Sequence, residues 1–266
     1  MDPFTKAVQL ARQERERQGL VPMGGRSLVP SEIVYTQTRK VDLYPGWLQR
    51  NRIIRADVND EVARAYKVLR TQVSRQMRQH GWKTLAVTSP SHGEGKTLTA
   101  INLAISLALE PNQTVLLVDA DLGQPSVHSY LGFEVEHGLR EYLVDNVPVE
   151  HILVHPQISR LVILPGSTGS ANSSELLSSP AMLHLVQELK RRYPTRVVVF
   201  DMPPVLTTDD VLAFSPYIDA ALLVVEDGKT LRDELARAAD LLKAANQNLI
   251  GTVLNKSDEK NNIYGF

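Results

Sequence analysis

A glycine-containing segment of this 266-residue chain carries the residue types that bind phosphate groups. Residues 89–97 read Ser-Pro-Ser-His-Gly-Glu-Gly-Lys-Thr and lie between an apolar run at 84–88 and a helix-periodic stretch at 98–109. A strand, a glycine-containing loop, Gly-Lys-Thr and a helix are the context of a P-loop, in which backbone N–H groups and the helix dipole face phosphate oxygens. This context predicts a nucleotide site rather than an ordinary strand–turn–helix connection.

The chemistry expected of this loop follows from its side chains. Lys96 places a positive charge at the β- and γ-phosphates, and the Thr97 hydroxyl is a ligand for Mg²⁺. Pro90 stands where the pattern G-x-x-x-x-G-K-[ST] has its first glycine, but Gly93 and Gly95 still allow the backbone to approach phosphate closely. The residues of the loop that we predict to bind nucleotide are Ser91, His92, Gly93, Glu94, Gly95, Lys96, Thr97 and Leu98.

Carboxylates follow two further apolar runs. Asp119 and Asp121 come after the run at 114–118, and Asp201 comes after the run at 196–200. The carboxyl ends of parallel strands meet at one crevice of an open α/β sheet, where ligands bind. One such aspartate is often only a turn or cap residue, but two sites together with a P-loop predict a centre for a nucleotide and its metal ion. We expect Lys96 and the three aspartates to form this centre.

The elements that must position these residues alternate along the chain. Strands are predicted at 84–88, 114–118, 152–154, 161–164, 196–200, 220–225 and 249–254. Helices are predicted at 57–80, 98–109, 124–131, 138–143, 180–192, 209–214 and 230–244, and a Pro-Gly turn at 45–46. This alternation predicts an α/β fold, a doubly wound and mostly parallel sheet with helices on both faces.

We divide the chain into three parts. Residues 1–56 are a basic extension with a helix at 5–18 and a flexible linker, residues 57–256 are the P-loop domain, and residues 257–266 are a tail. The helix at 57–80 is expected to bury one apolar stripe and to expose a basic face. The residues of that stripe are Val58, Val62, Tyr66, Leu69, Val73 and Met77.

Charge is distributed unevenly although the net charge is only −1. Residues 1–83 contain 16 Lys and Arg against 8 Asp and Glu, and residues 84–266 contain 13 against 22. This asymmetry predicts a basic arm for an acidic surface or, equally, a solvated helix face. No nucleic-acid module supports nucleic acid as a partner. The chain has no cysteine, no signal peptide and no long apolar run, so we expect a cytoplasmic protein without a transmembrane segment.

The motifs also resemble a known family. Residues 115–122, with Pro-Ser-Val-His at 125–128, resemble the second Walker motif (A′) of bacterial tyrosine kinases, the BY-kinases, which have a P-loop fold of the partition-ATPase-like class. Residues 198–206, with Asp-Met-Pro-Pro, are similar to their Walker B segment, residues 172–177 to a family loop, and residues 65–71 to their oligomerisation helix. The resemblance covers about residues 57–256. It is closest to free-standing cytoplasmic kinases encoded with exopolysaccharide loci.

The resemblance implies an ATP- and Mg²⁺-dependent tyrosine autokinase that regulates exopolysaccharide synthesis, chain length or export. The catalytic residues would be Lys96, Asp119, Asp121 and Asp201. Thr97, Asp119 and Asp201 would be metal ligands or near the metal, and Asp121 would be a second catalytic carboxylate. Which aspartate acts as the base stays open, because phosphoryl transfer depends mostly on positioning and charge. Asn255, just after the last strand, is a candidate for reading adenine, although a plain turn residue fits as well.

The resemblance also implies partners. The kinase would phosphorylate neighbouring copies in an oligomer, and a membrane protein that controls polysaccharide chain length would activate it and recruit it to the inner membrane face. The tail tyrosine Tyr264 is a candidate phosphoacceptor, because a polar tail can reach a neighbour's site, and Tyr35 and Tyr44 are alternatives. The oligomerisation residues would be Arg64, Lys67 and Arg70, or in another register Glu61, Arg64 and Lys67.

Two other functions fit the same residues. A partition-type ATPase switch would hydrolyse ATP without a protein substrate. That group usually carries an additional lysine early in the P-loop, where this chain has Pro90, Ser91 and His92, which favours the kinase. A nucleotide-binding scaffold without turnover is the other alternative. Two departures from the kinases keep this alternative open. Gly123 and Gln124 stand where the kinases usually have arginines, and the family's tyrosine cluster is reduced to Tyr264.

Overall fold

The computed structural model describes residues 38–55, 57–58, 60–167, 169–192 and 195–257. Every element described below lies within residues 33–266, one of the two compact units of the chain. The predicted helix at 5–18, Tyr35 and Tyr264 fall outside the described residues.

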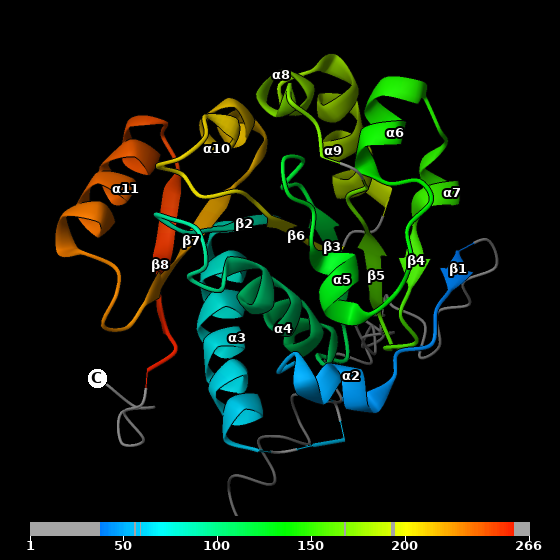
Figure 1. The fold of residues 1–266 in the computed structure, drawn as a ribbon, viewed down its shortest axis with the longest axis horizontal. Helices are drawn as coiled ribbons and strands as arrows, with labels where there is room; N and C mark the ends of the chain where they lie inside the picture. Colours follow the sequence, from blue (N-terminus) through cyan, green and yellow to red (C-terminus); the bar gives the residue numbers. More distant parts are fainter. Residues whose placement is uncertain (1–37, 56, 59, 168, 193–194, 258–266) are drawn as a thin grey trace, which may run out of the picture. The chain divides into compact units, whose positions relative to one another are not determined.

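The centre of this unit is an eight-stranded sheet with the order β1-β4-β5-β3-β6-β2-β7-β8 (Figure 1). All neighbouring strands are parallel except β4 and β5, which confirms the predicted doubly wound, mostly parallel sheet. The strands are β1 Arg39–Lys40, β2 Thr84–Thr88, β3 Thr114–Asp119, β4 Val154–His155, β5 Leu161–Leu164, β6 Arg196–Asp201, β7 Ala220–Glu226 and β8 Asn248–Asn255.

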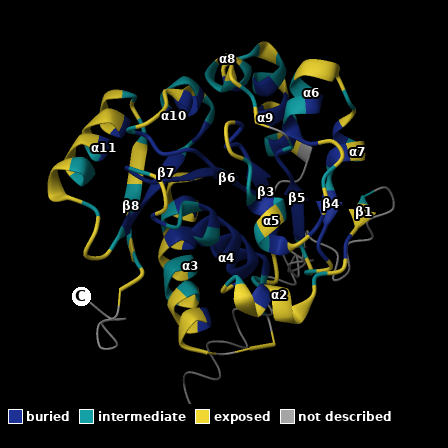
Figure 2. Ribbon diagram, viewed as in Figure 1, coloured by how far each residue is buried: buried dark blue, intermediate teal, exposed yellow. Residues whose placement is uncertain are grey.

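Helices cover both faces of the sheet, as predicted, and each face has its own hydrophobic core (Figure 2). The first face carries α2 Pro45–Arg50, α3 Glu61–His80, α4 Lys96–Ala108 and α5 Val127–Leu131. The second face carries α6 Leu139–Asp145, α7 Val149–Ile152, α8 Ser173–Leu177, α9 Pro180–Arg192, α10 Asp210–Phe214 and α11 Arg232–Ala244. A single 3₁₀ turn in the described part, η1 Ser215–Tyr217, follows α10.

The helix after the P-loop is the most deeply buried helix of the first face. From Thr97 to Ala108, every residue of α4 except Leu98 is buried. A helix that is enclosed on all sides must carry, around its whole circumference, apolar side chains or polar side chains whose hydrogen bonds are made within the protein. This explains the run of Ala, Ile and Leu in this segment. Its N-terminus is therefore fixed rigidly against the sheet, and the P-loop with it.

The N-terminal boundary predicted for α3 is wrong. The helix begins at Glu61 rather than at residue 57, because the Asp60 side chain caps it by accepting a hydrogen bond of 2.8 Å from the N–H of Ala63. Val58 therefore precedes the helix, and Val62 is 46% exposed although it was expected in the buried stripe. Gly81 ends the helix with a φ of 70°, a conformation that glycine adopts at little cost.

Two local predictions are also corrected. The Pro-Gly turn expected at 45–46 is the first turn of α2, because proline fits the first helical position, where its missing N–H costs no hydrogen bond. The strand expected at 152–154 is displaced, since Ile152 ends α7 and β4 begins at Val154. Short apolar runs have no clear period, so strand and helix are hard to distinguish there.

Candidate functional site

The sheet order brings the three predicted strand ends together. β3, β6 and β2 are adjacent, and Asp119 at the end of β3 is the register partner of Asp201 at the end of β6. Asp201 is in turn the partner of Val87 on β2, just before the P-loop. The two aspartates and the phosphate-binding loop therefore share one edge of the sheet.

The P-loop depends on two glycines with positive φ. Gly93 has a φ of 83° and Gly95 a φ of 96°, a region that other residues enter only with strain. A Cβ atom on Gly95 would lie 2.0 Å from Nδ2 of Asn255. Only glycine fits there, because the Asn255 side chain crosses the loop at that point.

Lys96 is held at the centre of the site by carboxylates. Its Nζ atom lies 2.7 Å from Oδ2 of Asp121 and 3.8 Å from Oδ1 of Asp201. Burial lowers the pKa of Lys96, but the charges of Asp201 and Asp121 outweigh burial and raise its pKa overall. The ammonium group is thus positively charged at neutral pH, as a phosphate-binding lysine must be.

The paired aspartates are costly to ionise together. Asp119 is fully buried, and burial together with the nearby Asp201 raises its pKa to about 8. Burial also raises the pKa of Asp201, to about 6, although the charge of Lys96 opposes this rise. Oδ2 of Asp119 accepts hydrogen bonds of 2.9 Å from the N–H groups of Ser126 and Val127.

The oxygen atoms of this pair fit a magnesium ion. Oδ1 of Asp119 and both carboxylate oxygens of Asp201 are buried and accept no hydrogen bond from the described residues, although Lys96 lies 3.8 Å from Oδ1 of Asp201. Such an arrangement is costly unless a cation completes it. Oγ of Thr97 lies 3.3 Å from the Ser126 hydroxyl. The described residues contain no cluster of three acidic, histidine or cysteine ligands. Mg²⁺ rarely uses such a cluster, since one or two carboxylates and substrate phosphates suffice.

A cavity of about 750 Å³ opens in front of these groups. Eight of the predicted site residues line it, namely His92, Gly93, Gly95, Lys96, Thr97, Leu98, Asp121 and Asn255. The cavity has the size of a small-molecule site and has the phosphate loop at its base. Ser91 and Glu94 are not among its lining residues, and Asp119 and Asp201 lie fully buried.

The end of β8 clamps the P-loop, a feature that the sequence did not reveal. Nδ2 of Asn255 donates a 2.8 Å hydrogen bond to the carbonyl of Glu94, and Nζ of Lys256 donates one of 2.7 Å to the carbonyl of Gly93. Lys256 also lies 2.9 Å from a carboxylate oxygen of Glu226. Residues outside the loop therefore hold the carbonyl groups of Gly93 and Glu94 in place. That Asn255 reads adenine stays a prediction.

Glu94 stabilises the loop from within, and sequence reasoning had placed it only among the nucleotide-binding residues. This side chain is 1% exposed. Its carboxylate accepts a 2.8 Å hydrogen bond from the N–H of Ser91 and another from the Thr230 hydroxyl. Ser126, which contacts both Thr97 and Asp119, was also missed as a site residue. The contacts of Glu94 with Thr230 and of Ser126 with Thr97 join segments distant in sequence, which no local pattern reports.

The predicted oligomerisation residues differ in their exposure. Arg64 and Lys67 are exposed, whereas Arg70 is half-buried. The Arg70 guanidinium donates to the carbonyl of Ser106 at 3.1 Å and lies 3.6 Å from Glu110. Arg70 therefore has partners within its own chain.

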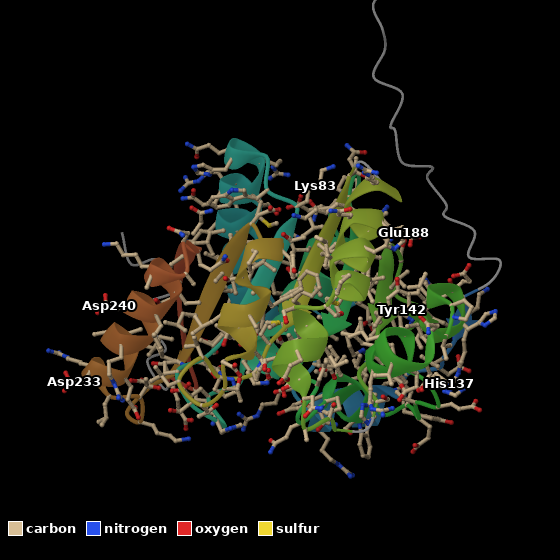
Figure 3. The ribbon with its side chains drawn as sticks, turned by 90° about the horizontal axis from the view of Figure 1, so that it is seen from above. Lys83, His137, Tyr142, Glu188, Asp233 and Asp240 are labelled. Atoms are coloured by element: carbon tan, nitrogen blue, oxygen red, sulfur yellow. The ribbon has the colours of Figure 1, made fainter. Side chains whose placement is uncertain are left out.

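Acidic side chains face solvent on another helix. Asp233 and Asp240 project outward from α11 (Figure 3).

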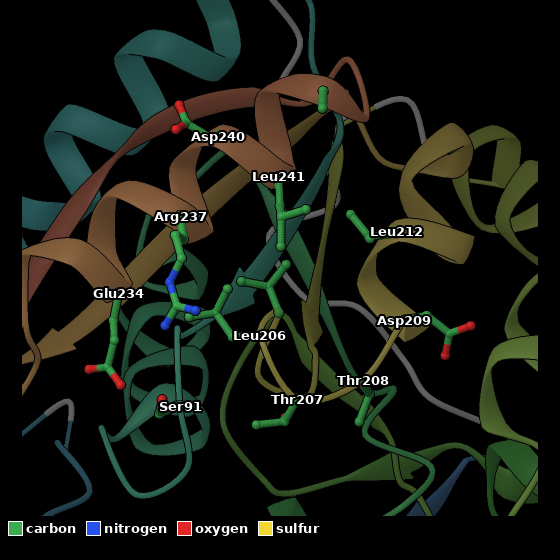
Figure 4. A pocket seen from close by; sticks show the side chains of 12 residues that line it. Ser91, Leu206, Thr207, Thr208, Asp209, Leu212, Glu234, Arg237, Asp240 and Leu241 are labelled. Carbon is green, nitrogen blue, oxygen red and sulfur yellow. The ribbon is translucent and has the colours of Figure 1, made fainter.

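A second and larger cavity, of about 1000 Å³, lies between α10 and α11 (Figure 4). Arg237 and Leu241 project into it from α11, and Leu206 faces them from the segment after β6. Ser91 at the edge of the P-loop also lines this cavity, but Lys96 and the three aspartates do not. It is therefore separate from the phosphate-binding centre.

Of the three candidate phosphoacceptors, only Tyr44 is among the described residues. It precedes α2 and is 72% exposed. No helix in the described part of the chain combines the length and the apolar character that crossing a bilayer requires.

Comparisons with known proteins agree with this geometry. A family model described as an AAA domain matches residues 82–226, more than half of the chain. The tyrosine-protein kinase YwqD of Bacillus subtilis is 32% identical over 220 residues, covering 82% of this chain and 92% of YwqD. These findings favour a kinase over the ATPase switch and the scaffold.

Solved structures show the same architecture. The BceF tyrosine kinase domain matches with a TM-score of 0.67 and 26% identity, covering 94% of this chain and 88% of that one. The chimerical protein CapA2B2 matches with a TM-score of 0.72 and 24% identity, covering 82% of this chain and 93% of that one, a likeness that speaks for the fold alone.

Proposed function

Because this chain belongs to the family of bacterial tyrosine-protein kinases, we propose that it transfers the γ-phosphoryl group of ATP to tyrosine hydroxyls. The observation that carries this proposal is the cluster of Lys96, Asp121 and the buried pair Asp119 and Asp201 at the P-loop. In the reaction the tyrosine oxygen bonds to the γ-phosphorus, the bond from that phosphorus to the β,γ-bridging oxygen breaks, and ADP leaves. The tyrosine proton passes to a carboxylate of the site.

The residues of the chain divide this work. Lys96 and the N–H groups of residues 93–97 bind the phosphates and stabilise charge that develops on them. Thr97, Asp119 and Asp201 would hold Mg²⁺, which supplies charge neutralisation at the phosphates when bound. Asp121 fixes the Lys96 ammonium group through its 2.7 Å contact.

Asp119 is the stronger candidate for the base. Burial and the nearby Asp201 raise the pKa of Asp119, so its carboxylate binds a proton more readily than an ordinary aspartate does. Asp121 is less suited, because its carboxylate is already engaged by the Lys96 ammonium group at 2.7 Å.

The substrate that we propose first is a second copy of the same chain. Tyr264, Tyr35 and Tyr44 are the candidate acceptors, and the exposure of Tyr44 supports access by a neighbouring site. By the same family resemblance, we propose that the kinase works in the cytoplasm on exopolysaccharide chain length or export. A membrane protein of the polysaccharide assembly system would activate it and hold it at the inner membrane face.

The test is mass spectrometry of the full chain after incubation with Mg-ATP, beside a Lys96→Met control. We expect phosphate on tyrosine that is absent in the control, and Tyr→Phe variants at positions 35, 44 and 264 to identify the acceptor. The incubation is repeated with vesicles that carry the membrane partner. ADP release without phosphotyrosine in both incubations would refute the kinase proposal and support the ATPase switch.

A further inference from the structure

Arg52 occupies a backbone conformation that is unfavourable for an arginine. It follows the C-terminus of α2 with a φ of 58°. Helices commonly end with a residue in this left-handed region, usually glycine or asparagine, because a Cβ atom there costs about 1 kcal/mol. Asn51, the preceding residue, has a φ of −88°. An arginine where glycine would be more stable suggests that the side chain itself is needed.

The buried helix α4 holds this segment in place. Nδ2 of Asn102 donates to the carbonyl of Arg52 at 3.0 Å, and Oδ1 of the same side chain accepts from the N–H of Ile54 at 2.9 Å. Ile53 and Ile54 are buried in the first hydrophobic core. The backbone of Arg52 is therefore fixed to the helix that begins at Lys96.

The guanidinium group of Arg52 is available to a ligand. Arg52 is exposed and lines the 750 Å³ cavity, and its guanidinium makes no hydrogen bond or ion pair with the residues that the structure describes. The neighbouring arginines are engaged elsewhere. Arg50 lies over the Trp47 ring at 6.0 Å, and Arg55 pairs with Asp57 at 2.5 Å.

The same cavity has an apolar wall. Val62 is 46% exposed and Leu254 is 59% exposed, although both are large apolar residues, and both line this cavity together with Ala65. Arg52 and Val62 also share a smaller neighbouring pocket, so the two belong to the same wall. The cavity thus joins the phosphate-binding loop to a wall that is apolar and carries the planar cation of Arg52. This combination matches a nucleotide, which has an anionic and an aromatic end.

We propose that Arg52 and Val62 form the binding wall for the base and ribose of the nucleotide, with the Arg52 guanidinium stacked on the base. Guanidinium groups stack well on aromatic planes, and Val62 gives the base an apolar surface to cover. The inference rests on the nucleotide use proposed above but not on tyrosine as the acceptor. Under this proposal Arg52 contributes to the affinity for the nucleoside part of the nucleotide, whereas other residues bind the phosphates.

The test is calorimetric titration of the full chain with ADP and, separately, with inorganic tripolyphosphate. Arg52→Ala is expected to weaken ADP binding about tenfold and to change tripolyphosphate binding less than about twofold. Arg52→Lys keeps the charge but loses the planar group, so an intermediate loss is expected. Arg50→Ala is the matched control, because Arg50 does not line the cavity, and it should bind both ligands as the parent chain does.

Arg52→Gly separates a ligand role from a structural one. Glycine relieves the positive φ, so this variant should unfold at the same or a higher temperature than the parent chain while binding ADP as weakly as Arg52→Ala. Unchanged ADP affinity in both variants would overturn the proposal, and so would an equal loss for tripolyphosphate. If the parent chain binds ADP but never forms phosphotyrosine, the kinase proposal fails and the assignment of Arg52 stands or falls by these titrations alone.

Discussion

The Nζ atom of Lys96 lies 2.7 Å from Oδ2 of Asp121, with the two side chains only 11% and 6% exposed. The P-loop lysine is therefore paired with the second carboxylate of the Asp-Ala-Asp segment. Phosphate oxygens that reach Lys96 must share its three N–H donors with this carboxylate. The salt bridge also keeps a positive charge beside Asp201, which would otherwise be harder to ionise.

Replacing Lys96 should abolish phosphoryl transfer. We expect Lys96→Met to lower the rate of phosphotyrosine formation at least ~100-fold, because a preorganised charge on the transferred group is lost. Removing the cation should also raise the pKa of Asp201 further, since Lys96 is the main influence that lowers it. Rates are measured by phosphopeptide quantification, and circular dichroism checks that the variant is folded. A folded variant with the parent rate would remove Lys96 from the mechanism.

The raised pKa values predict that stability falls as pH rises. The pKa of Asp119 is about 8 in the folded chain, against the ordinary value of 3.8 for an aspartate. Between these values the unfolded chain has released the proton while the folded chain retains it, so stability is highest at acidic pH and is lost toward pH 8. Asp201, with a pKa of about 6, acts in the same direction over a narrower window.

Asp119→Asn should therefore stabilise the fold while it abolishes phosphoryl transfer. Asparagine keeps the acceptor for the N–H groups of Ser126 and Val127 but cannot ionise. We expect the gain in unfolding free energy to be at least about 1 kcal/mol at pH 8 and smaller at pH 5. Urea unfolding at several pH values measures it, and the exposed Asp240→Asn variant serves as control. A gain that is independent of pH would show that the carboxyl group is not responsible.

Gly95 should tolerate no side chain. The Gly95→Ala variant would place Cβ 2.0 Å from Nδ2 of Asn255 and would impose a positive φ on alanine, so we expect ADP affinity to fall at least about tenfold. Gly46→Ala is the control. Gly46 lies in α2, where a Cβ atom meets nothing within 4 Å, so this change should be neutral or stabilising. Equal behaviour of the two variants in calorimetric titration would contradict the close approach of Asn255.

The Asn255 clamp should affect phosphate binding even without a base. Asn255→Ala removes the hydrogen bond to the carbonyl of Glu94, so we expect tripolyphosphate affinity to fall about threefold to tenfold. If the variant loses more affinity for ADP than for tripolyphosphate, the difference measures a contact of Asn255 with adenine. Unchanged tripolyphosphate affinity would exclude a role for the clamp in phosphate binding.

The basic helix α3 offers a test of assembly. Arg64 is exposed, whereas Arg70 is bound to Ser106 and Glu110 of the same chain. Arg64→Glu should therefore reduce oligomer formation without changing the unfolding temperature, and Arg70→Ala should lower stability by about 1 kcal/mol. Light scattering after size exclusion and thermal unfolding measure the two effects. If Arg64→Glu left the oligomer intact, the predicted interface on α3 would be wrong.

The sequence by itself determined the local chemistry. Glycine spacing and the flanking strand and helix identified the P-loop, and apolar runs ending in aspartate located Asp119 and Asp201. Each of these signals is contained in fewer than about 20 consecutive residues, where period and residue type are informative. The parallel, doubly wound sheet followed from the alternation of such segments.

Tertiary structure alone decided which of these groups touch. The order β3-β6-β2 makes Asp119 and Asp201 register partners. The hydrophobic period of a segment does not indicate which strands become neighbours in the sheet. The start of α3 at Glu61 leaves Val62 exposed at the cavity that Arg52 also lines. Such contacts depend on the packing of segments that are distant along the chain, whereas a sequence pattern reports only on its own neighbourhood.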